Sequence, residues 1–109
     1  MRGIVAALFL GFATSAGAAG ISIGHEELPP RTSMADCLRM ARSTMTDAGL
    51  TPLRSTSSAA WGENRAGDQL YTIYCIPASG LAVVVGAADN AELVERTVQR
   101  LRSLLADGK

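Results

Sequence analysis

The sequence predicts an α+β domain, a two-layer sandwich in which a three-stranded antiparallel meander carries two helices on one face. Three observations lead to this class. The stretches QLYTIYCIP and LAVVVGAAD, separated by a short ASG turn, form a hairpin pattern of β-branched and aromatic residues around a Pro/Gly turn. Segments with apolar residues at three- and four-residue steps flank the strands, giving the order α-β-β-β-α. The only two cysteines, Cys37 and Cys75, lie in the first helical segment and in the hairpin.

Residues 1–18 have the pattern of a secretory signal peptide. Arg2 provides a positive start, the apolar run IVAALFLGFA follows, and small residues favour cleavage between Ala18 and Ala19. The run is shorter than the roughly 20 apolar residues of a membrane span. We therefore expect general secretion into a bacterial periplasm or medium, with no membrane attachment after cleavage. An uncleaved amino-terminal anchor is the alternative.

The two cysteines predict one disulfide, Cys37–Cys75, because an exported chain meets an oxidising compartment. Closing a loop of about 40 residues stabilises a fold by about 4 kcal/mol in the chain-entropy account. The alternative is two free or metal-binding thiols, and the sequence offers no second Cys/His pair to complete a metal site.

The charge balance excludes two classes of partner. The chain has ten basic and ten acidic residues, and the basic residues form no cluster in the sequence. A chain of this kind lacks the electrostatic footprint of a nucleic-acid binder and the polybasic stripe of a membrane-surface helix.

The helices have recognisable ends. Residues 19–31, with Pro29-Pro30, are expected as an extended lead-in, and residues 32–107 as a single domain. The first helix should run from Ser33 to Ala48, with Thr32 or Ser33 as N-cap and a Schellman end in which Gly49 is C′ and Leu50 contacts Met45. The last helix should begin at Asp89 or Asn90. The expected buried stripes are Met34, Cys37, Leu38, Ala41, Met45 and Ala48 in the first helix, and Val94, Thr97, Val98, Leu101, Leu104 and Leu105 in the last.

The strand pattern is strongest in the hairpin. A polar strand from Arg54 to Trp61 is the weakest expected element, and the following ENRAGD is a loop. A turn over Pro77–Gly80 places Leu81 opposite Ile76, whereas a one-residue slip would reverse the faces of the last strand.

The disulfide assigns the two faces of the sheet. If Cys75 meets a helix, then Tyr71 and Ile73 share the covered face, because side chains alternate along a strand. The other face then carries the candidate interface or ligand residues, to which Trp61 is added: Leu70, Tyr74, Ile76, Leu81, Val83 and Val85. Exposed apolar patches of this kind mark interfaces or ligand grooves. The alternative is that the lead-in, or the flank of the first strand, covers this face.

No catalytic or metal pattern emerges. The serines of TPLRSTSSAAWG lack the Gly-x-Ser-x-Gly elbow, and the single histidine, His25, lies in the lead-in. We expect no cofactor and no metal. An enzyme would need a cleft where His25, Glu63 or Asp68 converge.

The chain resembles small uncharacterised proteobacterial exported domains, which are domains of unknown function with an α-β-β-β-α order and one disulfide. The resemblance rests on the helix bearing Cys37, the YTIYC strand, the VVVG strand and the capped last helix. It covers about the last three-quarters of the chain and implies no catalytic residues.

The sequence therefore predicts a non-enzymatic exported domain that acts by protein–protein contact through its apolar open sheet face, with a homodimer as the favoured assembly. A module that binds a small apolar ligand on the same face is the alternative, and an enzyme is the least favoured class.

Overall fold

The computed structural model describes residues 19–108 and shows an α+β sandwich of one sheet and two helices. The expected signal peptide, residues 1–18, lies outside the described residues. The strands are β1 Gly20–Glu27, β2 Thr51–Pro52, β3 Ala59–Glu63, β4 Gln69–Ile76 and β5 Leu81–Ala88; the helices are α2 Met34–Asp47 and α3 Ala91–Asp107, with a short 3-10 turn, η1, at Pro77–Ser79.

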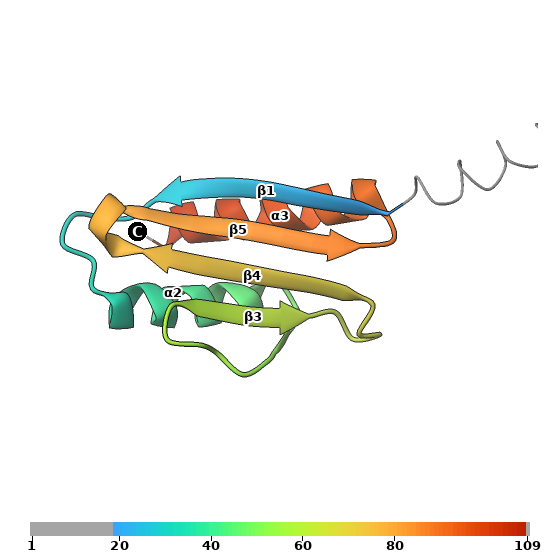
Figure 1. Ribbon diagram of the computed structural model, residues 1–109, viewed down its shortest axis with the longest axis horizontal. Helices are drawn as coiled ribbons and strands as arrows, with labels where there is room; N and C mark the ends of the chain where they lie inside the picture. Colours follow the sequence, from blue (N-terminus) through green and yellow to red (C-terminus); the bar gives the residue numbers. More distant parts are fainter. Residues whose placement is uncertain (1–18, 109) are drawn as a thin grey trace, which may run out of the picture.

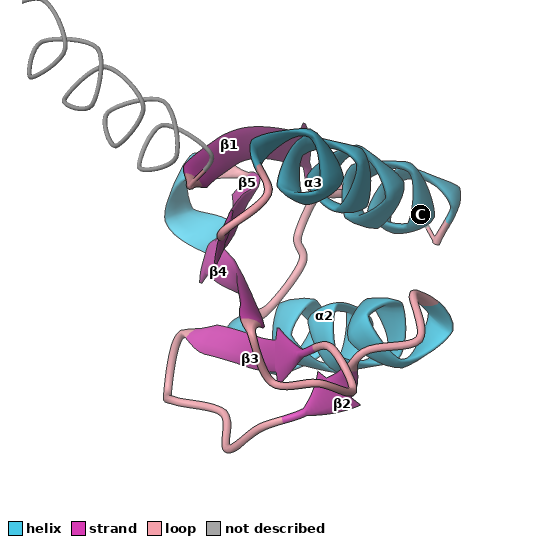
Figure 2. Cartoon of the chain, turned by 90° about the vertical axis from the view of Figure 1, so that its right-hand side faces the viewer, coloured by secondary structure: helices cyan, strands magenta, loops and turns pink. Residues whose placement is uncertain are grey.

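The sheet has five strands in the order β1-β5-β4-β3-β2, and every neighbouring pair is antiparallel. Both helices lie on the same side of it: α3 covers β1 and β5, whereas α2 covers β4 and β3 (Figures 1 and 2). The α+β class is thus confirmed. The three-stranded sheet and the order α-β-β-β-α do not match the structure. The sheet has two further strands, because β1 precedes the first helix and β2 follows it, and the expected meander corresponds to β3, β4 and β5.

Strand β1 forms within the segment that was expected to be an extended lead-in. All eight of its residues pair with β5, so it is an edge of the sheet. Its helix-facing positions carry small residues where α3 passes closely. A Cβ atom added at Gly20 would lie 2.5 Å from the Cβ atom of Ala91, and one at Gly24 would lie 2.5 Å from Cδ of Arg102. The apolar signal of a buried strand face is therefore missing, which is why the pattern did not predict a strand.

The polar stretch after α2 is mostly loop. The expected strand from Arg54 to Trp61 is wrong over its first half: the strand begins at Ala59 and continues to Glu63. Thr56 explains the difference, because its Oγ1 accepts a hydrogen bond from the Ala59 N–H at 3.1 Å and its N–H donates to the Ala59 carbonyl at 2.9 Å. Threonine side chains offer the backbone such turns in place of sheet pairing.

Side-chain caps begin both helices where the sequence predicts them. Ser33 Oγ accepts from the Asp36 N–H at 3.0 Å, and Asn90 Oδ1 accepts from the Leu93 N–H at 2.9 Å. The Arg39 guanidinium donates to the Asp36 carboxylate and, together with Ser33, lowers the pKa of Asp36. These contacts fix the first turns that orient each helix on the sheet.

The end of α2 has the predicted Schellman geometry. Gly49 is left-handed at φ 80°, its N–H donates to the Thr46 carbonyl at 2.9 Å, and the Leu50 N–H donates to the Met45 carbonyl at 3.0 Å. Leu50 and Met45 are both buried, so the chain turns from the helix directly towards the sheet.

The predicted disulfide is present between Cys37 of α2 and Cys75 of β4, with their Cα atoms 6.1 Å apart. Both cysteines are buried. Beside them lie Tyr71 and Ile73, which are also buried under the helices. The Tyr71 ring fits against Gly86, where an added Cβ would be 2.6 Å from the ring carbon Cε1. The disulfide therefore links the first helix to the central strand and fixes which face is covered.

Candidate interaction surface

The side of the sheet opposite the helices forms a continuous surface, which we call the open sheet face. Its position follows from the alternation of buried and accessible residues along β4 and β5. The predicted register is confirmed, because Leu81 pairs with Ile76 and Val83 with Tyr74. The accessible residues of the open sheet face on β1, β5, β4 and β3 are Ile21, Ile23, His25 and Glu27 of β1; Leu81, Val83, Val85 and Ala87 of β5; Leu70, Thr72, Tyr74 and Ile76 of β4; and Trp61 and Glu63 of β3. Ala59 of β3, opposite Tyr74, lies on the same side but is buried.

Large apolar side chains are unusually accessible here. Ile21 is 72% exposed, Ile23 70%, Tyr74 46% and Leu70 42%. Of the five large apolar residues that are exposed in the described part of the chain, these four lie on the open sheet face, and only Leu53 lies elsewhere. Single exposed apolar residues are ordinary, but a contiguous group on one sheet face is typical of a contact surface.

The structure brings the sequence-predicted residues together on this face. Leu70, Tyr74 and Ile76 lie along β4, and Leu81, Val83 and Val85 lie on the neighbouring β5. Trp61 lies on β3 opposite Thr72, half-buried.

Sequence reasoning missed the two most exposed members, Ile21 and Ile23. The alternating pattern Ile-Ser-Ile could have indicated them, because one face of an edge strand can be apolar while the other carries only small residues. The segment that carries them does not cover the open sheet face. It lies beside β5 and enlarges that face (Figure 1).

Charge on the open sheet face is sparse. Its only ionisable side chains other than tyrosine are His25, Glu27 and Glu63, which lie on the outer strands β1 and β3. The ion pair of β1, in which Arg102 Nε lies 3.1 Å from Glu26 Oε1, is on the helix side of the sheet. The middle of the face is therefore neutral and apolar, and none of the residues of the face is a lysine or an arginine.

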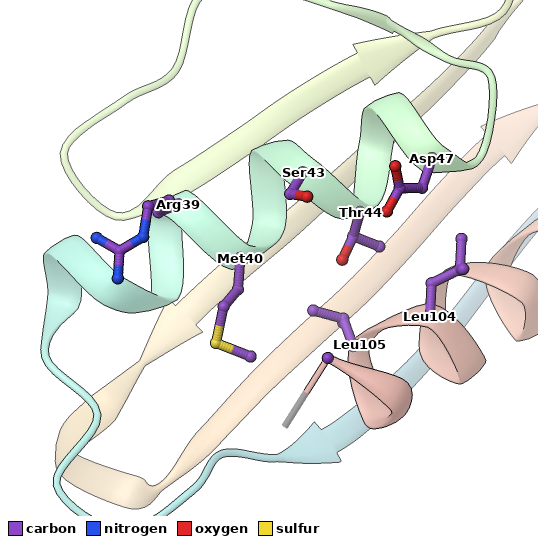
Figure 3. A pocket seen from close by; sticks show the side chains of 8 residues that line it. Arg39, Met40, Ser43, Thr44, Asp47, Leu104 and Leu105 are labelled. Atoms are coloured by element: carbon purple, nitrogen blue, oxygen red, sulfur yellow. The ribbon is translucent and has the colours of Figure 1, made fainter.

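A groove that the sequence did not predict lies between the two helices (Figure 3). It measures about 300 Å³. Its lining comprises Arg39, Met40, Ser43, Thr44 and Asp47 of α2, with Leu104, Leu105 and Gly108 at the end of α3. Ser43 has no histidine partner there, because the only histidine lies on the other side of the sheet.

The three residues named as conceivable enzyme groups do not converge. His25 lies on β1 and Glu63 on β3, with β5 and β4 between these strands. Asp68 lies in the loop before β4, where its Oδ1 accepts from Asn64 Nδ2 at 2.6 Å. Among residues 19–108, no group of three or more His, Cys, Asp or Glu side chains is arranged to hold a metal ion.

Comparison with known protein families found no family model that matches the chain, and comparison with curated proteins found no match. Within the described residues, neither helix has the length and apolar character needed to cross a membrane.

Proposed function

We propose that this protein acts by protein–protein contact through the open sheet face, and that its partner there is a second copy of the chain. The observation that supports this most is the group of four exposed apolar side chains on one face: Ile21, Ile23, Leu70 and Tyr74. Covering them removes apolar surface from water, the main favourable term in association.

The size of the face suggests a weak, reversible contact. Three of its strands have eight residues. Such strands are about 26 Å long, and four neighbouring strands span about 19 Å, giving roughly 500 Å² per copy. Two copies would then cover roughly 1,000 Å² in total, the lower end for specific interfaces. We therefore expect association in the micromolar range.

A second copy fits the chemistry of this face. Two sheets can stack about 10 Å apart with their apolar side chains interleaved, as in a β-sandwich. The neutral centre of the face allows two identical surfaces to meet without like charges opposing each other there. Two-fold dimers are also the commonest soluble assemblies.

We infer that this contact forms outside the cytoplasm, after removal of residues 1–18. The Cys37–Cys75 disulfide supports this placement, because such bonds persist in oxidising compartments. In this proposal the domain is periplasmic or secreted and performs no catalysis.

Trp61 provides a test, because it is the only tryptophan in the chain and lies on the open sheet face. We expect quenching of its fluorescence by acrylamide to weaken as the concentration of the mature chain rises from about 1 to about 100 μM, the range of micromolar association. The physical reason is that a second sheet excludes the quencher.

Two results would contradict the proposal. Equal quenching at all concentrations would mean that the face stays uncovered. Protection that requires an added apolar ligand, at constant protein concentration, would instead favour the small-ligand module.

A further inference from the structure

We propose a second self-association site, distinct from the open sheet face: the free edge of β1 pairs with β1 of another copy. The two strands would run antiparallel about a two-fold axis at Ile23 and join two five-stranded sheets into one of ten strands. Three features favour this contact: the backbone of β1, the contrast between the two sheet edges, and the charges of α3.

The backbone of β1 presents hydrogen-bonding groups at its free edge. The Leu28 N–H, just after β1, donates to the Gly80 carbonyl at 2.8 Å, in register with the β1–β5 pairing. Hydrogen bonds in an antiparallel pair recur at every second residue. The even-numbered residues of β1 therefore bond to β5, and the N–H and C=O groups of Ile21, Ile23, His25 and Glu27 point away from the sheet.

The two edges of the sheet differ in how they are protected. Strand β2 has two residues, one of which is Pro52. Short strands and prolines are ordinary devices that prevent edge pairing. Strand β1 has eight residues, no proline and no bulge, since its register with β5 is unbroken from Gly20 to Glu27. The β1 edge is thus the one that remains open to another strand.

The side chains of β1 permit self-pairing with the axis at Ile23. On the open sheet face, Ile23 would lie opposite the partner's Ile23, and Ile21 opposite the partner's His25. On the helix side, Ser22 would lie opposite the partner's Gly24, where the Arg102 side chain of α3 occupies the space above the glycine. Ile21 and Ile23, the two most exposed large apolar residues within 19–108, would move from the rim of the sheet to its centre.

Helix α3 adds a complementary surface. It lies over both β1 and β5. With strands about 4.8 Å apart, two α3 helices related by this axis would be about 10 Å apart, an ordinary packing distance. Arg102 and Gln99 mark the β1 side of α3, since Arg102 bonds to both Glu26 and Gln99.

The charges along that side of α3 fit a two-fold arrangement. Glu95 and Glu92 continue the same side towards the helix start, one and two turns before Gln99, and Arg96 lies beside them. The two helices would run antiparallel, so Glu92 and Glu95 of each would meet the half of the other that carries Arg102. Such complementarity favours this register over a parallel approach.

Cysteine cross-linking tests the edge contact and its register in the mature chain. The two variants are Ile23→Cys and Ile21→Cys, and each also carries Tyr74→Asp to remove the open-face contact. We expect Ile23→Cys to form a disulfide-linked dimer readily under mild oxidation, because Cα atoms of directly opposed, hydrogen-bonded residues lie about 5.5 Å apart. Ile21→Cys is the matched control, equally exposed, but its two copies would be about 13 Å apart and should not cross-link. Absent cross-linking at position 23, or equal cross-linking at both positions, would overturn the proposal.

A backbone variant gives an independent readout. In the Tyr74→Asp chain, His25→Pro removes an outward N–H without breaking a bond to β5, and edge strands tolerate proline at such positions. We expect it to be monomeric by sedimentation velocity, whereas His25→Thr stays dimeric, and both should unfold at similar urea concentrations. If His25→Pro dimerises as well as His25→Thr, the edge is not the site. If the open-face contact does not exist, Tyr74→Asp will leave the association of the otherwise wild-type chain unchanged. The two proposals are therefore contradicted by different results.

Discussion

Replacement of both cysteines, Cys37→Ala with Cys75→Ala, is expected to lower the free energy of unfolding by about 4 kcal/mol. The bond closes a loop between residues 38 positions apart, and without it the unfolded chain regains that freedom. A domain of this size has a net stability of about 5 to 13 kcal/mol, so the loss is a large share of the total. Urea unfolding followed by circular dichroism measures it.

Reduction of the wild-type disulfide provides the control. It opens the same loop but keeps both sulfur atoms, so it separates loss of the cross-link from loss of side-chain packing. We expect the reduced wild type to lose most of what the double variant loses. A loss below about 1 kcal/mol in both proteins would show that the bond is not a main source of stability.

Tyr74→Asp is expected to weaken association through the open sheet face by about 100-fold or more. Tyr74 lies opposite Val83 in the middle of the sheet and is 46% exposed in the single chain. An apolar sheet that covers an aspartate at this position removes water from its carboxylate and offers no hydrogen-bond partner in return, which costs free energy. A two-fold contact contains this substitution twice, so the cost is incurred twice. A hundredfold change corresponds to about 2.7 kcal/mol. Dilution of a fluorescently labelled chain measures the dissociation constant.

Two matched variants show whether the weaker association of Tyr74→Asp comes from the added charge alone or from its position on the open sheet face. Tyr74→Phe keeps the apolar ring and should associate as the wild type does. Ala35→Asp adds the same charge at an exposed position on α2, in the helical layer, and should also leave association unchanged. Equal weakening by Tyr74→Asp and Ala35→Asp would mean that net charge, not the open sheet face, controls association.

The central part of the fold could be predicted because several local signals agree there. Alternation along Gln69–Ile76, the turn before Leu81 and the pairing of Cys37 with Cys75 all require the same covered face. The buried stripe of α2 also includes Cys37, so the helix and strand patterns lead to one arrangement. The same agreement located Tyr74 and Val83 on the open sheet face.

The outer strands could not be predicted because their signals are not local. Strand β1 buries mainly glycine and serine under α3, and its pairing partner β5 lies some 60 residues later in the sequence. Strand β1 is stabilised by pairing with the free edge of β5 and by the close approach of Ala91 to Gly20. A short stretch of sequence shows neither contact. The contribution of Ile21 and Ile23 to the candidate surface was lost with it.

Sedimentation equilibrium of the mature wild-type chain tests self-association without a label or a probe, because it measures the molar mass itself. Between about 1 and about 100 μM, we expect a mass that rises with concentration to at least twice that of a single chain. We also expect Tyr74→Asp to reduce this mass. A wild-type mass equal to one chain at every concentration would contradict self-association through the open sheet face.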